Sequence, residues 1–363
     1  FEIQKRAQVL GEVTRLERGL CVAGTHGKTT TSTMTAHLLK QSHVDCNAFL
    51  GGISKNYTSN LLLSDKSDLV VIEADEFDRS FHHLTPYMAV ITAVDADHLD
   101  IYGTHEAYLE SFAHFTSLIR EDGCLIVKKD IALQPRLGKN VKLYTYSATE
   151  KADFYAKNVR VGNGTIIFDF VTPTETISDI ELGVPMLVNV ENSVAAMALA
   201  WLNGVTANEL RNGMKSYAGI RRRFETWLKT DHLTIIDDYA HHPAEVEASI
   251  KSVKALYADK KVLGVFQPHL YTRTRDFYKE FAAALSHLDE AMLVELYPAR
   301  EQPIEGISSK TIFDEITCPK TLTTKEKLIE TLKNKQFDVL LTLGAGDIDT
   351  YLPKIVEALK TKR

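Results

Sequence analysis

Runs of consecutive apolar residues recur along the first part of the chain, and each ends in polar residues. Three of these runs lie at 20–23, 69–72 and 88–91, and an amphipathic stretch at 29–40 follows the first. Strands of a parallel sheet that is covered on both faces read as continuous apolar segments of this kind. The pattern predicts an α/β fold with a mostly parallel sheet, and a functional site where polar residues follow the strand ends.

The pattern changes between about 153 and 189, where short segments punctuated by Thr and Gly, such as 165–170, predict hairpins. From Leu233 onward, apolar runs alternate with helical stretches again, which predicts a second, Rossmann-like doubly wound unit. Its four strands are expected at 234–236, 262–266, 291–296 and 338–343. We expect two domains, at 1–220 and 221–363.

A glycine loop separates the first predicted strand from the helix that follows it. The loop reads Gly24-Thr25-His26-Gly27-Lys28-Thr29-Thr30. Such a loop lets backbone N–H groups surround a phosphate, while the lysine reaches the terminal phosphates and a hydroxyl binds Mg²⁺. Val22 stands where a strict phosphate loop has its first glycine, so the loop is a shortened form. The alternative is a Gly- and Thr-rich turn that only begins a helix, which leaves the lysine unexplained.

Acidic and imidazole side chains follow the next two predicted strands. They belong to the segments Glu73-Ala74-Asp75-Glu76 and Asp95-Ala96-Asp97-His98. Since the carboxyl ends of parallel strands meet at one edge of a sheet, these donors can converge near Thr29 as ligands of Mg²⁺. Taken alone, each segment is also typical of a solvated loop.

Composition excludes several classes of protein. The 42 Lys and Arg residues stand against 48 Asp and Glu residues, and a net charge of -6 argues against a surface that binds nucleic acid. No apolar run approaches the roughly 20 residues of a membrane span. The four cysteines lack the spacing of a zinc site or a disulfide framework. We therefore expect a cytoplasmic protein with neither nucleic acid nor membrane as a partner.

Six motifs, in order along the chain, resemble those of the Mur ligases. They are the loop at 24–30, Glu-Ala-Asp-Glu at 73–76, Asp-Ala-Asp-His-Leu-Asp at 95–100, Arg-Arg-Phe-Glu at 222–225, Asp-Asp-Tyr-Ala-His-His-Pro at 237–243 and Phe-Gln-Pro-His-Leu-Tyr-Thr-Arg-Thr at 266–274. The resemblance implies a central ATPase domain and a C-terminal Rossmann-like domain, preceded in the family by a UDP-binding domain. Because the predicted helix at 1–18 begins without a convincing cap, we expect the chain to be a fragment that lacks this first domain.

The resemblance also implies the nucleotide and metal sites, with ATP and Mg²⁺ as cofactors. Lys28, His98 and Arg223 would be the catalytic residues. Thr29, Glu73 and His98 would serve the metal, Asn192 would bind the adenine, Arg223 the γ-phosphate and Asp238 the ribose. Beside Arg223, Arg221 and Arg222 read as a solvated basic run, and 344–347 as a plain strand-to-helix turn.

Four further residues match the segments with which the family binds its amino acid, namely Tyr239, His241, His269 and Arg273. A guanidinium suits the α-carboxylate, because it can donate two parallel hydrogen bonds. A histidine near the amine could take its proton. Leu270 stands where some relatives carry a second arginine, so a clamp with two arginines is not expected.

The motifs resemble most the branch of the family that adds L-alanine to UDP-N-acetylmuramic acid. The implied reaction forms an acyl phosphate on the lactoyl carboxylate, which the amine of alanine then attacks. A recycling ligase that adds a tripeptide, and a P-loop protein without ligase activity, are the alternatives. No lysine occurs at 98–127, where other branches carry a carbamylated lysine, and this favours the alanine-adding branch. The oligomeric state is left open between a monomer and a weak dimer.

Overall fold

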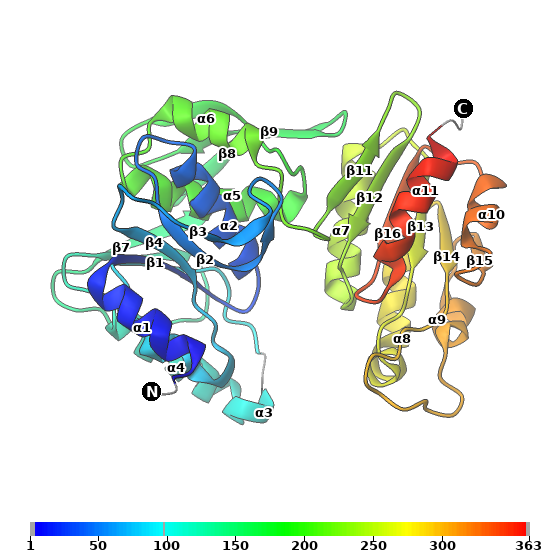
Figure 1. The fold of residues 1–363 in the computed structure, drawn as a ribbon, viewed down its shortest axis with the longest axis horizontal. Coiled ribbons are helices and arrows are strands. Elements are labelled where there is room, and N and C mark those ends of the chain that lie inside the picture. Colours follow the sequence, from blue (N-terminus) through cyan, green and yellow to red (C-terminus); the bar gives the residue numbers. More distant parts are fainter. Residues whose placement is uncertain (1–3, 97–98, 361–363) are drawn as a thin grey trace. The chain divides into compact units, whose positions relative to one another are not determined.

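A computed structural model describes residues 4–96 and 99–360, without the side chains of Leu99 and Asp100. The chain forms two compact units. The first comprises Phe1–Arg160, Ile167–Gly183 and Val188–Arg221, and the second comprises Val161–Ile166, Val184–Leu187 and Arg222–Arg363. Each unit contains one sheet between helices (Figure 1).

The sheet of the first unit runs in the order β10-β9-β8-β7-β6-β5-β1-β4-β2-β3. Its strands are β1 (Arg18–Ala23), β2 (Asn47–Ser54), β3 (Ser59–Leu62), β4 (Leu69–Glu73), β5 (Met88–Ile91), β6 (Cys124–Lys128), β7 (Lys142–Ser147), β8 (Phe154–Gly162), β9 (Thr165–Val171) and β10 (Thr176–Glu181). The pairs from β2 to β8 are parallel, whereas β3 and β10 add antiparallel edges. The parallel centre and the hairpin near 165–170 agree with the sequence pattern.

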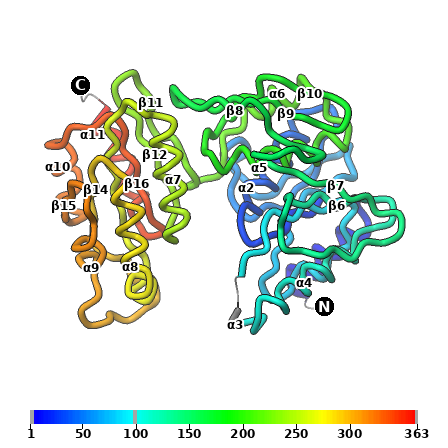
Figure 2. The backbone as a smooth tube through the Cα atoms, turned by 180° about the vertical axis from the view of Figure 1, so that it is seen from behind, coloured from blue at the N-terminus to red at the C-terminus, as the bar shows by residue number. Residues whose placement is uncertain are grey.

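Helices cover both faces of this sheet. They are α1 (Arg6–Leu16), α2 (Lys28–Lys40), the 3-10 helix η1 (Phe77–His83), α3 (Leu99–Tyr102), α4 (His105–Ser117), α5 (Leu187–Leu202) and α6 (Ala207–Ser216). Figures 1 and 2 show α1 and α4 on one side of the sheet, and α2, α5 and α6 on the other. On the first side, Leu10, Phe81, Phe112 and Phe115 pack against buried residues of the strands.

The sheet of the second unit runs in the order β11-β12-β16-β13-β14-β15. Its elements are β11 (Glu225–Lys229), β12 (Thr234–Asp238), α7 (Pro243–Leu256), β13 (Val262–Phe266), α8 (Tyr271–Leu285), β14 (Glu290–Leu293), α9 (Ser309–Glu315), β15 (Lys320–Leu322), α10 (Leu328–Lys333), β16 (Val339–Leu343), the 3-10 helix η2 (Ile348–Tyr351) and α11 (Leu352–Leu359). All pairs are parallel except β11 with β12. Helices α7 and α8 lie on one face and α11 on the other (Figure 2).

Two strands of the second unit were absent from the sequence prediction of four. The edge strand β11 pairs antiparallel with β12, and the short β15 forms the opposite edge. Edge strands are partly exposed, so neither reads as the continuous apolar run of a buried parallel strand. Among the residues described, no helix combines the length and apolar character that crossing a bilayer requires.

Candidate active site

The glycine loop joins the end of β1 to the start of α2, in the first unit. Gly24 and Gly27 have φ angles of +134° and +81°, which side chains disfavour. A Cβ at Gly24 would lie 2.1 Å from Thr92 Oγ1 and 2.8 Å from the backbone nitrogen of Ala93. At Gly27 it would lie 2.6 Å from Asn192 Oδ1. Both glycines are therefore needed for the loop to pack against its neighbours.

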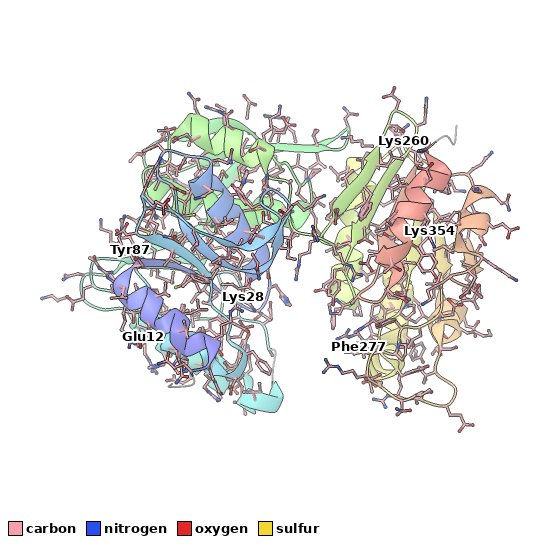
Figure 3. The ribbon with its side chains drawn as sticks, viewed as in Figure 1. Glu12, Lys28, Tyr87, Lys260, Phe277 and Lys354 are labelled. Carbon is pink, nitrogen blue, oxygen red and sulfur yellow. The ribbon has the colours of Figure 1, made fainter. Side chains whose placement is uncertain are left out.

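Lys28 is the first residue of α2 (Figure 3), and its ammonium group reaches back to the start of the loop. Its Nζ donates to the carbonyl of Gly24 and to Glu76 Oε1, both at 2.7 Å. The side chain of Glu76 is fully buried, and the hydroxyl of Tyr102 donates to its carbonyl oxygen. An ion pair inside protein is stronger than one in water, so Glu76 is well placed to hold the lysine beside the loop. The sequence places Glu76 in an acidic motif but does not indicate that it pairs with Lys28.

Glu73 and Thr29, the two described residues predicted to serve the metal, pack against neighbouring glycines of β2. The carboxylate of Glu73 lies against Gly51, where an added Cβ would be 2.1 Å from Oε2. The methyl group of Thr29 lies against Gly52, at 3.2 Å from such a Cβ. In the described part of the chain, no group of three or more His, Cys, Asp or Glu residues is arranged to hold a metal. His98 lies outside the described residues.

The remaining loop side chains are tied to the elements around them. Thr25 donates its backbone N–H to the carbonyl of Ala93, and its hydroxyl lies 3.0 Å from the carbonyl of Asp95 and from the hydroxyl of Tyr108. His26 is exposed, 3.9 Å from the carboxylate of Asp95. Thr30 is half-buried in the first turn of α2. The loop therefore has fixed ends and an exposed centre.

Asn192 lies in α5, buried next to the loop. Its Oδ1 accepts from the hydroxyl of Thr31 at 3.4 Å, and its Nδ2 donates to Asn189 Oδ1 at 3.1 Å. Its amide oxygen also lies against Gly27. The structure thus brings Asn192 and the loop together, although 161 positions separate Asn192 from Thr31.

In the second unit, β12 ends in two buried aspartates. The carboxylate of Asp238 accepts from the hydroxyl of Ser249 and the backbone N–H of Phe224. Asp237 accepts from the hydroxyl of Thr342 at 2.6 Å. Burial is the main cause that raises the pKa of Asp237 to about 7 and that of Asp238 to about 6. Asp238, predicted to bind ribose, is thus engaged inside its own unit.

Arg222 is not part of a solvated run, and the turn at 344–347 is not a plain one. Arg222 Nη2 donates to the carbonyls of Gly344 and Gly346, both at 3.0 Å, and its Nε lies 3.3 Å from Asp349. Its guanidinium also lies 4.8 Å from the ring centre of Tyr239. The sequence does not show the bonds to Gly344 and Gly346, because more than 120 positions separate these residues from Arg222. Arg223, next along the chain, is exposed, and its charge helps to lower the pKa of Glu245.

The four residues predicted to bind an amino acid lie together in the second unit. The ring centre of His241 is 5.1 Å from that of Tyr239 and 6.1 Å from that of His269. Arg273 Nη1 lies 3.4 Å from His269 Nδ1. Burial is the main cause that lowers the pKa of both histidines. For His269, the charge of Arg273 lowers the pKa further. Two neutral imidazoles and a guanidinium thus share one cluster near pH 7.

Family profiles match most of the chain. The Mur ligase middle domain matches residues 22–200, and the Mur ligase glutamate ligase domain matches residues 222–346. The chain belongs to the Mur ligase family. It is 65% identical over 360 residues to the UDP-N-acetylmuramate–L-alanine ligase of Parabacteroides distasonis, an alignment that covers 99% of this chain and 78% of that protein. The enzyme of the same name from Christiangramia forsetii is 45% identical, with the same coverage.

Solved Mur ligases have the same fold. The UDP-N-acetylmuramate-alanine ligase of Thermotoga maritima superposes with a TM-score of 0.80 at 25% identity, over 98% of this chain and 78% of that one. A Mur ligase of Thermotoga maritima solved with ADP gives a TM-score of 0.75 at 18% identity, over 100% of this chain and 86% of that one. These findings confirm the family and the α/β fold expected from the motifs.

Proposed function

We propose that the protein that carries this chain is an ATP-dependent ligase that joins L-alanine to the lactoyl carboxylate of UDP-N-acetylmuramic acid. This step belongs to the synthesis of peptidoglycan precursors. The identity of 65% over 360 residues to a relative named for this reaction carries the proposal. The positions of Lys28, His269 and Arg273 in two clusters support it.

ATP fits the loop of the first unit. The loop at 24–30 offers backbone N–H groups and the start of α2 to the phosphates, and Lys28 offers its ammonium. Asn192 would bind the adenine, Arg223 the γ-phosphate and Asp238 the ribose. Lys28 and Arg223 would stabilise charge on the phosphoryl group while the lactoyl carboxylate attacks it, which gives ADP and an acyl phosphate.

The donors beside the loop also suit Mg²⁺. The hydroxyl of Thr29 and the carboxylate of Glu73 are oxygen ligands, and His98 would add a nitrogen ligand. Mg²⁺ is commonly held by one or two carboxylates together with phosphates and water, so a larger protein cluster is not required. When bound, the ion would neutralise charge on the phosphates.

The cluster in the second unit suits the second half-reaction. Arg273 would hold the carboxylate of L-alanine, with Tyr239 beside the histidines. The amine attacks only after it loses a proton, and His241 or His269 can accept that proton because burial keeps both imidazoles neutral. Attack on the acyl phosphate then forms the amide bond and releases phosphate.

Phosphate release in the natural protein that carries this sequence tests the proposal. We expect release only when Mg-ATP, UDP-N-acetylmuramic acid and L-alanine are all present. Lys28→Ala should abolish it, whereas replacement of the exposed Lys66 in the same unit should leave it unchanged. Turnover with a tripeptide but none with alanine would favour a recycling ligase instead. ATP hydrolysis without any acceptor would favour a P-loop protein that is not a ligase.

A further inference from the structure

The chain beyond β14 runs beside the segment that carries His269. The backbone N–H of Tyr297 donates to the carbonyl of Pro268 at 2.8 Å, and that of Leu270 donates to the carbonyl of Tyr297 at 3.0 Å. His269 and Tyr297 form an isolated parallel bridge, and their rings stack with centres 5.8 Å apart and planes 10° from parallel. The backbone and the ring of His269 are thus both held by Tyr297.

The same loop completes the start of α8. The first N–H groups of a helix lack partners within it, and Leu270, which precedes α8, has no side-chain acceptor to offer. Glu301 supplies one from 29 positions away, since its carboxylate accepts from the hydroxyl of Thr272 at 2.5 Å and from its N–H at 3.0 Å. The N–H of Tyr271 donates to it as well. The bond from the hydroxyl of Thr272 is the main cause that lowers the pKa of Glu301, and the two backbone bonds add to it. The carboxylate that caps the helix is therefore anionic.

Leu270 itself has an unfavourable conformation that these contacts maintain. Its φ is +72° and its ψ is 136°, a region that residues with a Cβ seldom occupy. His269 immediately precedes it, and Arg273 lies in the first turn of the helix that follows. The direction of Arg273 relative to His269 therefore depends on how the chain turns at Leu270.

We propose that Glu301 is a positioning residue for the amino-acid substrate, acting through the first turn of α8 to set Arg273 against His269. This inference rests on the proposed function, since it takes Arg273 and His269 to be the groups that bind alanine. Glu301 would not touch the substrate. Without its carboxylate, the first turn of α8 loses its bonds to the loop, and Arg273 loses its fixed direction.

Steady-state kinetics of the natural protein test this inference. Glu301→Ala removes every acceptor and should raise the KM for L-alanine about tenfold, with the KM for ATP unchanged. Glu301→Gln keeps one carbonyl oxygen as an acceptor and should fall between the wild type and the alanine variant. A residue that only stabilises the unit would not produce this graded effect on one substrate alone.

Thr206→Ala is the matched control. Thr206 caps α6 in the first unit by accepting from the N–H of Glu209, so its loss removes a helix cap from the unit that does not contain the cluster. It should lower the melting temperature without changing the KM for alanine. An unchanged KM for alanine in both Glu301 variants would overturn the inference, as would an equal loss for ATP and alanine. A wild-type protein without alanine-dependent phosphate release would instead refute the proposed function, and the inference with it.

Discussion

Asp237 should make the second unit less stable as the pH rises. Its side chain is fully buried at the end of β12, where its carboxylate accepts a hydrogen bond from the hydroxyl of Thr342. Burial raises its pKa to about 7, and the nearby charges of Asp238 and Asp349 add to the rise, although Arg222 and the bond from Thr342 oppose it. The native unit therefore favours the protonated carboxyl, whereas the unfolded chain ionises at the ordinary pKa of 3.8.

The difference between the native and unfolded pKa of Asp237 determines how the free energy of unfolding changes with pH. Between pH 3.8 and pH 7 the native state holds a proton that the unfolded state has released, so the free energy of unfolding falls as the pH rises through that window. The pKa difference of about 3 units corresponds to about 4 kcal/mol over the whole window. From pH 5 to pH 8 the expected loss is about 3 kcal/mol, because part of it has already occurred by pH 5.

Asp237→Asn removes the titrating group while keeping the shape of the side chain. The chain has two tryptophans, Trp201 in the first unit and Trp227 in β11, so a Trp201→Phe background reports on the second unit alone. Urea unfolding at pH 5 and pH 8 should show the asparagine variant gaining about 3 kcal/mol relative to its parent at the higher pH. Asp259→Asn, which makes the same change at an exposed position, is the control. An equal difference between variant and parent at both pH values would refute the reasoning.

Two further predictions concern the first unit. Burial lowers the pKa of His37 to about 4, so its contribution to the stability of the first unit is fully present above pH 6.5 and is lost as the pH falls. From pH 8 to pH 5, the fluorescence of Trp201 in a Trp227→Phe background should report a loss of about 2 kcal/mol in the free energy of unfolding, and His37→Gln should abolish this loss. A loss that persists in the variant would exclude His37 as its cause. Gly24→Ala should destabilise the unit in urea unfolding by at least about 2 kcal/mol, because its Cβ meets Thr92. Gly204→Ala, where φ is +92° but none of the described residues lies within 4 Å of the new Cβ, should cost only about 1 kcal/mol, and equal costs would contradict the steric argument.

The buried centre of each sheet could be predicted from the sequence. The strands β1, β4, β5, β12 and β13 are buried along almost their whole length, so each reads as an apolar run. Elements at the margins could not be predicted. In β7 buried and exposed positions are mixed, and in β11 every position is at least partly exposed, so neither strand gives a continuous apolar signal.

The candidate site could be predicted in part, for a related reason. Gly24, Lys28 and Glu73 belong to short motifs at strand ends, where the type and spacing of residues already indicate phosphate or metal chemistry. Their order along the chain is also specific. What the motifs do not contain is the pairing between them, since Lys28 and Glu76 lie 48 positions apart and meet only through the order of the strands.

The residues that could not be predicted from the sequence contact other residues of the candidate site. Glu76 binds Lys28, Glu301 caps the helix that carries Arg273, and Arg222 holds the turn after β16. Gln267 is another such residue. Its buried side-chain amide donates to the carboxylate of Asp347 at 2.7 Å and accepts from the N–H of Ile348 at 3.0 Å. These bonds connect the segment before His269 to that same turn. A contact with substrate can be inferred from the chemistry of one side chain. A contact between two supporting residues can be inferred only when the positions of both in the fold are known. The geometry around His269 and Arg273 is therefore set largely by residues whose own chemistry does not indicate a function.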